Sequence, residues 1–173
     1  SGYRITDIYR DEANDINGDG LFDQLTISVQ VQVSLAGIYN LNGRLTDING
    51  HLLGWATTGD ISLAPGFHVL SLIYSGVNIR SNGVDGPYFM GPLSFYALND
   101  PNNGDLRFKA YQTFPYKVTT FFSELSFGGI PDVTVQPGQF YDNIIDLKQY
   151  TAHAVLPLSE VSYKVFINTD PKI

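Results

Sequence analysis

The sequence has no cysteine, and it contains no apolar run of the length that a membrane-spanning helix needs. Without cysteine no disulfide closes a loop, and the redox compartment cannot be read from the composition. A helix that crosses a bilayer requires about 20 predominantly apolar residues, so we expect no membrane insertion. The stability of the 173-residue chain therefore has to come from a hydrophobic core, for which 43% hydrophobic residues suffice, or from bound ions.

Basic residues are scarce. Ten Lys and Arg stand against 17 Asp and Glu, which gives a net charge of −7, and the basic residues form no cluster. Nucleic-acid binding depends on Lys and Arg side chains that neutralise phosphates, so we expect no nucleic-acid partner. Glutamate is scarce as well, since 14 of the 17 acidic residues are aspartate. Aspartate favours turns, so this excess indicates a chain rich in loops and suited to binding cations.

Recognisable catalytic motifs are also missing. The three histidines, His51, His68 and His153, show no zinc-binding spacing, and no Gly-x-Ser-x-Gly elbow or phosphate-binding loop occurs. A Ser/His/Asp triad assembled from distant residues stays open, because such triads are recognised by geometry rather than by sequence position. The sequence favours a protein that is not an enzyme, with structural roles for its histidines.

What the chain does contain is a succession of strand patterns. Apolar and polar residues alternate without a break over residues 24–33, and Asn49-Gly50 is a strong hairpin signal. The expected strands are Tyr3–Tyr9, Gln24–Ser34, Ile38–Asp47, His51–Thr57, Phe67–Tyr74, Tyr88–Leu98, Leu106–Phe114 and Tyr116–Phe127. Their spacing predicts an all-β fold, an antiparallel β-sandwich of jelly-roll or Ig-like type, followed by a short β-rich C-terminal segment. No pattern for a three-turn helix is found, and only Asp142–Tyr150 allows a helical turn.

Gly128-Gly129 is the predicted domain boundary. Residues 1–128 would form the sandwich. The 45 residues from 129 to 173 are few for an independent domain, which at that size usually needs disulfides or a metal. They are either a short β subdomain or the truncated start of a second Ig-like module in a longer multidomain chain.

Residues 15–23 read Asp-Ile-Asn-Gly-Asp-Gly-Leu-Phe-Asp, which is the ligand spacing of a calcium-binding loop. Oxygen donors fall at positions 1, 3, 5 and 9, and glycine occupies position 6, where the chain must turn sharply. Leu21 would contribute its backbone carbonyl. The predicted metal ligands are therefore Asp15, Asn17, Asp19, Leu21 and Asp23. The alternative is a solvated acidic turn that binds no metal.

The loop differs from an EF-hand in two respects. Its twelfth position is Thr26 instead of a bidentate Glu, and a strand pattern follows it where an EF-hand has a helix. The loop therefore leads into a sheet, and further ligands have to come from elsewhere. Asp11 and Glu12 are the nearest candidates in sequence, and Asp100 and Asp105 are distant ones.

Aromatic residues make up 13% of the chain and offer a second functional route. A carbohydrate-binding module stacks sugar rings on exposed aromatic side chains. The candidates are Trp55, Tyr74, Tyr88, Tyr96, Tyr111 and Tyr116. Large aromatic side chains also supply much of the buried area of a core, so we expect Trp55 in the core. The tyrosines fit either place, and Tyr88, which follows Gly86-Pro87, is expected to fix a turn.

The order of these features resembles β-sandwich modules of large secreted and cell-surface proteins of bacteria and archaea, including extensions of extracellular proteases. The resemblance covers roughly residues 3–127. The residues that carry it are the loop 15–23, Leu25-Thr26-Ile27-x-Val29-x-Val31, Gly37-x-Tyr39-x-Leu41-x-Gly43-x-Leu45, Gly50, Trp55-Ala56, Leu63-x-x-Gly66, Gly83-x-x-Gly86-Pro87-Tyr88, Ala110-Tyr111-x-Thr113-x-x-Tyr116 and Phe121. Residues 130–150 resemble the start of bacterial Ig-like or cadherin-like repeats, except that Thr151-Ala152-His153 stands where such repeats carry an acidic residue.

The resemblance implies a non-catalytic module, extracellular or at the cell surface, with an adhesive, spacer or ligand-binding role. In that setting Ca2+ is abundant and serves as a structural staple. The expected partners are calcium and either a carbohydrate or a surface protein. The alternative implied by the same resemblance is a carbohydrate-binding accessory module of a secreted hydrolase or protease.

Overall fold

The computed structural model describes residues 2–123, 126–127 and 151–152. Its contacts divide the chain into two units, Ser1–Ser123 and Glu124–Ile173. In the second unit, β10 (Ser126–Phe127) pairs antiparallel with β11 (Thr151–Ala152). The predicted boundary at residues 128–129 and the helical turn at 142–150 lie outside the described residues, as does the repeat-like stretch 130–150.

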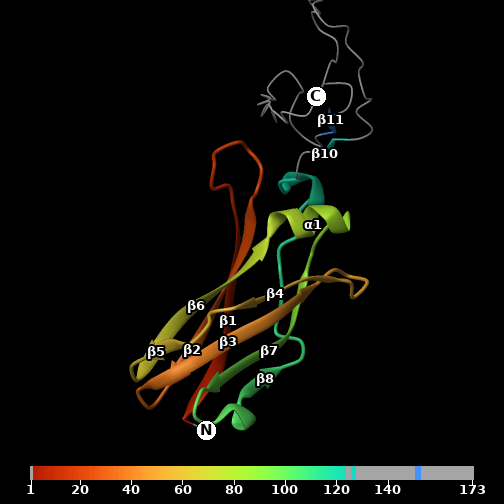
Figure 1. The fold of residues 1–173 in the computed structure, drawn as a ribbon. Helices are drawn as coiled ribbons and strands as arrows, with labels where there is room; N and C mark the ends of the chain where they lie inside the picture. The colour runs from red at the N-terminus through yellow and green to blue at the C-terminus, as the bar shows by residue number, and fades with distance from the viewer. Residues whose placement is uncertain (1, 124–125, 128–150, 153–173) are drawn as a thin grey trace, which may run out of the picture. The chain divides into compact units, whose positions relative to one another are not determined.

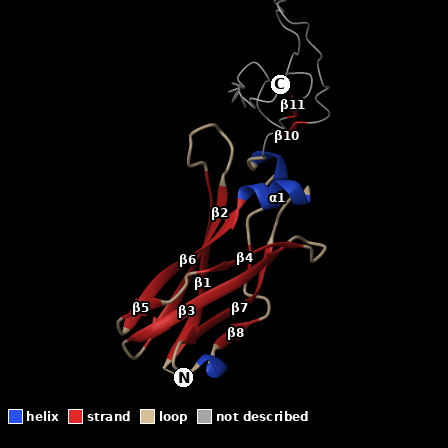
Figure 2. Cartoon of the chain, viewed as in Figure 1, coloured by secondary structure: helices blue, strands red, loops and turns tan. Residues whose placement is uncertain are grey.

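The first unit is a sandwich of two antiparallel sheets, which confirms the predicted all-β sandwich fold (Figures 1 and 2). One sheet has the order β1-β2-β6 and the other the order β4-β3-β7-β8, with β5 beside β3 and β9 beside β7. The strands are β1 (Tyr3–Asn14), β2 (Gln24–Val33), β3 (Gly37–Thr46), β4 (Leu52–Thr57), β5 (Ile61–Leu63), β6 (Gly66–Ser75), β7 (Phe89–Ala97), β8 (Asp105–Arg107) and β9 (Tyr111–Gln112).

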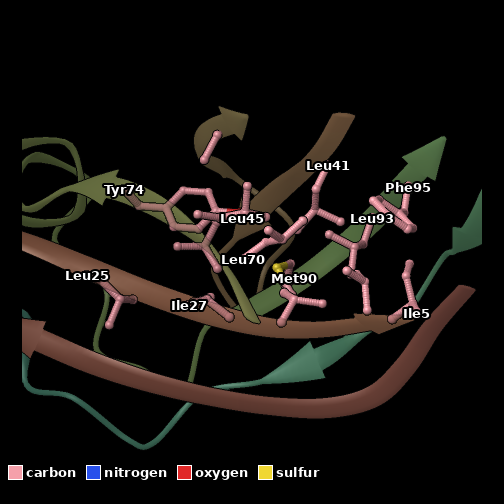
Figure 3. Close-up of a cluster of buried hydrophobic side chains, with 14 of the residues drawn as sticks. Ile5, Leu25, Ile27, Leu41, Leu45, Leu70, Tyr74, Met90, Leu93 and Phe95 are labelled. Carbon is pink, nitrogen blue, oxygen red and sulfur yellow. The ribbon is translucent and has the colours of Figure 1, made fainter. Parts of the chain in front are cut away.

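The core lies between the two sheets and follows from the alternation in the sequence. Every second residue of β2, from Leu25 to Val33, is buried, because successive side chains of a strand point to opposite faces. Figure 3 shows Leu25 and Ile27 of this sheet facing side chains of the other sheet, Leu45 and Met90 among them. Each large apolar side chain that is fully buried contributes about 2 kcal/mol, so this interface dominates the stability of the sandwich.

Three predicted strands are wrong in extent. The strand predicted at Tyr3–Tyr9 continues to Asn14 as β1. Leu106–Phe114 is not one strand, because the chain pairs with β7 only through β8 and β9. Between them it bends around Gly91, where an added Cβ would lie 2.1 Å from the carbonyl oxygen of Phe108. Tyr116–Phe127 is not one strand either, since residues 118–120 form the 3-10 turn η2 (Val118–Thr120).

A short helix, α1 (Gly76–Asn82), was not predicted. Ser75 caps its start by accepting a hydrogen bond from the Asn78 N–H, and Gly83, with φ of 74°, ends it. Seven residues are too few for a helical periodicity to show in the sequence, although both cap residues are present. No helix in the described part of the chain is long and apolar enough to cross a membrane.

Candidate functional site

The loop 15–23 is the hairpin connection between β1 and β2. The Asp23 N–H donates to the carbonyl of Asn14 at 2.9 Å and closes the hairpin. In Figure 1 the loop stands at the end of the sandwich away from the N-terminus. The predicted arrangement, a loop that feeds a long strand rather than a helix, is therefore confirmed.

Inside the loop, carboxylates and amide groups bind the backbone. The two carboxylate oxygens of Asp15 accept the Gly18 N–H at 2.7 Å and the Gly20 N–H at 2.8 Å. Gly18 and Gly20 have φ of 79° and 89°, a region that favours glycine. The two glycines thus allow the chain to wrap around one carboxylate, which fixes the orientation of Asp15.

The other polar side chains of the loop are ordered in the same way. The Asn17 amide oxygen accepts the Asp19 N–H at 2.9 Å, and Asp19 accepts the Leu21 N–H at 2.8 Å. Asp23 reaches across the loop and accepts the Ile16 N–H at 2.7 Å. Each carboxylate oxygen has two lone pairs and uses at most one of them in these bonds, so acceptor capacity remains on Asp15, Asp19 and Asp23.

Leu21 anchors the loop through its side chain, which is 4% exposed. Its side chain is therefore engaged in packing, and only its main chain is left for binding. The next residue, Phe22, is bonded to a distant segment on both sides: its N–H donates to the Thr120 carbonyl and its carbonyl accepts from the Phe122 N–H, both at 2.9 Å. The ring of Phe22 lies 5.7 Å from the ring of Phe121.

The loop carries uncompensated negative charge. Asp15, Asp19 and Asp23 take part in none of the ion pairs found among the described residues. Nor does any group of three or more His, Cys, Asp or Glu side chains in the described ranges have an arrangement that would hold a metal ion. The donors fit Ca2+ in kind, since all are oxygens. A calcium ion would need the amide oxygen of Asn17 and a backbone carbonyl beside the carboxylates.

The four further residues considered as calcium ligands from the sequence either bind other side chains or lie at the far end of β1. Both oxygens of Asp11 accept tyrosine hydroxyls at 2.6 Å, and Glu12 pairs with Arg10. Asp105 accepts the N–H of Ile5, near the start of β1. Asp100, next to η1 (Pro101–Asn103), lies at that same end. The 12-residue β1 separates the two ends by about 35 Å at roughly 3.3 Å per residue.

Asp11 is a buried carboxylate that links β1 to the segment 111–116, and no local pattern in the sequence indicates this role. It is 6% exposed and binds the hydroxyls of Tyr111 and Tyr116. Burial and the adjacent Asp11 carboxylate raise the pKa of Tyr111 to about 12. The same causes raise the pKa of Tyr116. Both tyrosines therefore stay neutral donors at any ordinary pH.

Asp47 is a second buried carboxylate with a structural task. Burial alone would raise its pKa, but hydrogen bonds from the side chain of Asn82 and from His51 and Asn49 outweigh burial and lower the pKa of Asp47 to about 2. These bonds hold the β3–β4 turn and connect it to α1. His51 is thereby occupied, and His68 contacts the carbonyl of Ala64 at 2.7 Å. His153 lies outside the described residues.

The predicted burial of Trp55 is wrong. Its side chain is 58% exposed, because Trp55 points outward from β4, where Leu53 and Ala56 occupy the buried positions. Tyr74 and Tyr88 are the aromatic candidates that belong to the core. Tyr88 also fulfils the turn role expected of it, since its hydroxyl donates to the Val84 carbonyl.

An open groove of about 560 Å³ lies beside the bend in the chain at Gly91. Phe108, 76% exposed, and Ile48, 64% exposed, line it. Lys109 and Gln112 also line it, and their side chains make no hydrogen bond within the described residues. The sequence does not mark Phe108 as a candidate, because the alternation over residues 106–114 predicts a regular strand there.

No family model matches this sequence, and no curated protein does. Among solved structures, the C-terminal domain of wzt aligns with 80% of this chain and 84% of its own, at 13% identity and a TM-score of 0.45. A DUF4785 family protein from Legionella pneumophila aligns with 68% of this chain and 28% of its own, at 21% identity and a TM-score of 0.41. These are similarities of fold alone.

Proposed function

We propose that this protein is a non-catalytic, calcium-stabilised β-sandwich module with an extracellular or cell-surface location and an adhesive, spacer or ligand-binding role. The observation that carries the proposal is the hairpin loop 15–23, in which three carboxylates and one amide oxygen are held in place by backbone N–H groups. Three aspartates within nine residues repel one another unless a cation is present. A calcium ion removes that repulsion and fixes the β1–β2 hairpin.

The histidines support the non-catalytic part of the proposal. His51 holds the β3–β4 turn with Asp47, and His68 binds a backbone carbonyl four residues earlier. Neither is paired with a nucleophile in the part of the chain that the structure describes. Their contacts are those of structural side chains, and the loop 15–23 offers carboxylate and amide oxygens, the kind of donor that Ca2+ prefers.

Calcium binding is tested by thermal unfolding and titration calorimetry of the whole chain, with CaCl2 or with EDTA. At a free calcium concentration about 100 times Kd, binding stabilises the folded state by roughly 2.7 kcal/mol, which raises the Tm by about 5–10 °C. We expect the double variant Asp15→Asn/Asp19→Asn to lose both the heat of binding and the Tm shift. Glu12→Gln is the control, because it removes an exposed carboxylate close to the loop. An unchanged Tm together with no heat of binding overturns the calcium proposal.

The groove beside Phe108 favours a second candidate, a carbohydrate-binding accessory module. A pyranose ring has one apolar face, which stacks on an exposed aromatic ring, and hydroxyl groups around its edge. Phe108 offers the ring, and Lys109 and Gln112 offer polar groups beside it that make no side-chain hydrogen bond among the described residues. The groove volume of about 560 Å³ falls within the range of small-ligand sites.

This second candidate is tested with soluble oligosaccharides, cellopentaose and chitopentaose, in calorimetric titrations. We expect Phe108→Ala to weaken binding about fivefold to tenfold, since loss of one aromatic stacking contact costs about 1 kcal/mol. Phe114→Ala is the matched control, because Phe114 is 67% exposed and does not line the groove. Equal affinities of the two variants exclude this groove as a sugar site.

A further inference from the structure

The two lateral sides of the sandwich differ in how their edge strands are protected. On one side lie β1 and β8, and on the other lie β4 and β6, which Figure 1 shows on opposite sides. An edge strand exposes backbone N–H and C=O groups that can pair with another chain, and natural proteins usually block such pairing with charges, bulges or coverage.

The β1–β8 side is blocked. A register shift between Ile5 and Tyr9 interrupts β1, and Asp7 there has φ of 60°. Arg107 forms an ion pair with Asp7 at 3.1 Å, and Asp105 accepts the N–H of Ile5 at 2.8 Å. Side chains of β8 thus occupy backbone groups that would otherwise be free on β1.

Within the part of the chain that the structure describes, the β6 edge has none of these devices. It runs for ten residues, Gly66–Ser75, without a bulge in its pairing with β2 and without Asp, Glu, Lys or Arg. Its outward side chains include Phe67, Val69 and Ile73, which are 62%, 65% and 54% exposed. The outer edge of β6 pairs with no other strand of the described residues. The neighbouring edge strand, β4, is uncharged too and exposes Leu52 and Trp55.

We propose that β6 is a self-association edge, at which two copies of this chain pair β6 with β6 in antiparallel orientation. The two three-stranded sheets then form one continuous six-stranded sheet about a two-fold axis. A second copy is the fitting partner because the chain carries a net charge of −7, and this side is one where two acidic molecules meet without opposing charged side chains. Because both copies use the same edge in an isologous contact, the assembly also stops at a dimer.

The exposed side chains select a register. With the two-fold axis at Leu70, each Phe67 lies opposite the Ile73 of the second copy, and each Val69 lies opposite Ser71. Aromatic and β-branched residues form favourable cross-strand pairs. The contact between two single strands is narrow, so it buries less than the area of about 800 Å² per partner that is typical of stable interfaces. We therefore expect a reversible dimer with a Kd in the micromolar range.

Sedimentation velocity of the full chain over a concentration series tests the proposal. We expect a monomer–dimer equilibrium that Val69→Lys weakens about tenfold or more, because a lysine at the paired edge is left without a partner. Gln30→Lys is the matched control: Gln30 lies directly opposite Val69 on the same sheet face, but on the inner strand β2. Melting curves check that both variants are folded, as the 65% exposure of Val69 predicts.

The absence of native cysteine allows a test of the register. Under oxidation, a mixture of Val69→Cys and Ser71→Cys chains should give the mixed disulfide in preference to either homodimer, since like positions lie farther apart than a disulfide spans. Three results overturn the proposal. One is a monomer at all concentrations, with β6 covered by the rest of the chain. The second is a dimer that Val69→Lys leaves intact. The third is preferential crosslinking of like positions.

Discussion

Phe121→Ala is expected to lower the free energy of unfolding by about 4 kcal/mol, as removal of a fully buried Phe side chain usually costs 3–5 kcal/mol. Phe121 is 0% exposed and lies at the centre of an aromatic cluster, with the rings of Phe22, Tyr88 and Tyr116 at 5.7, 6.4 and 5.8 Å. It also pairs with Phe22 through a β-bridge. The substitution therefore leaves a cavity directly beneath the end of the loop 15–23.

Urea denaturation measures this loss of stability, and two further variants serve as comparisons. Phe114→Ala removes the same side chain from a position that is 67% exposed and should change stability by less than about 0.5 kcal/mol. Phe121→Leu keeps most of the volume and should cost about 1–2 kcal/mol, so an effect remains measurable if the alanine variant does not fold. Equal effects of Phe121→Ala and Phe114→Ala would show that the aromatic cluster does not hold this end of the sandwich.

Asp11→Ala is expected to cost about 3 kcal/mol. The substitution removes two short hydrogen bonds, from Tyr111 and Tyr116, to a buried charged acceptor. Hydrogen bonds to charged groups contribute about 1.5–3 kcal/mol each, and part is recovered where the tyrosine hydroxyls reach water. Tyr116→Phe should cost about half as much, and a double-mutant cycle between the two changes measures their coupling.

A spectroscopic titration distinguishes the effect of the hydrogen bonds between Asp11 and the two tyrosines from the effect of packing. Burial and the Asp11 carboxylate together raise the pKa of Tyr111, so in Asp11→Ala the pKa of Tyr111 should fall from about 12 towards its ordinary value of 10. The chain has 11 tyrosines, so the pKa is measured from the part of the tyrosinate absorbance that Tyr111→Phe removes. In the native protein, a pKa raised on folding contributes stability that is present below pH 10 and is lost as the pH rises through about 12. Glu12→Ala, one residue on and exposed, should change neither quantity.

The agreement between sequence and structure is greatest where a periodic pattern decided the outcome. The alternation over residues 24–33 predicts β2 because one face of that strand must be buried, and no other arrangement buries all five apolar residues. The loop 15–23 could likewise be predicted as a turn that leads into a strand, since its glycines and aspartates interact over only a few residues. The helix α1 and the bend at Phe108 were missed because neither has a period, and both depend on contacts with distant segments.

The sequence by itself determined the two-sheet core and the acidic hairpin loop, because hydrophobic alternation and loop chemistry act between near neighbours. Only the tertiary structure decided which carboxylates remain available. Asp11 and Asp105 bind partners about 100 residues away, which no local pattern encodes. The carboxylates of Asp15, Asp19 and Asp23 bind, among the described residues, only groups of their own loop. It also decided that Trp55 faces outward, because the β3–β4 pairing shifts register at Leu53. The order of strands leaves β6 as an unpaired edge within the described residues.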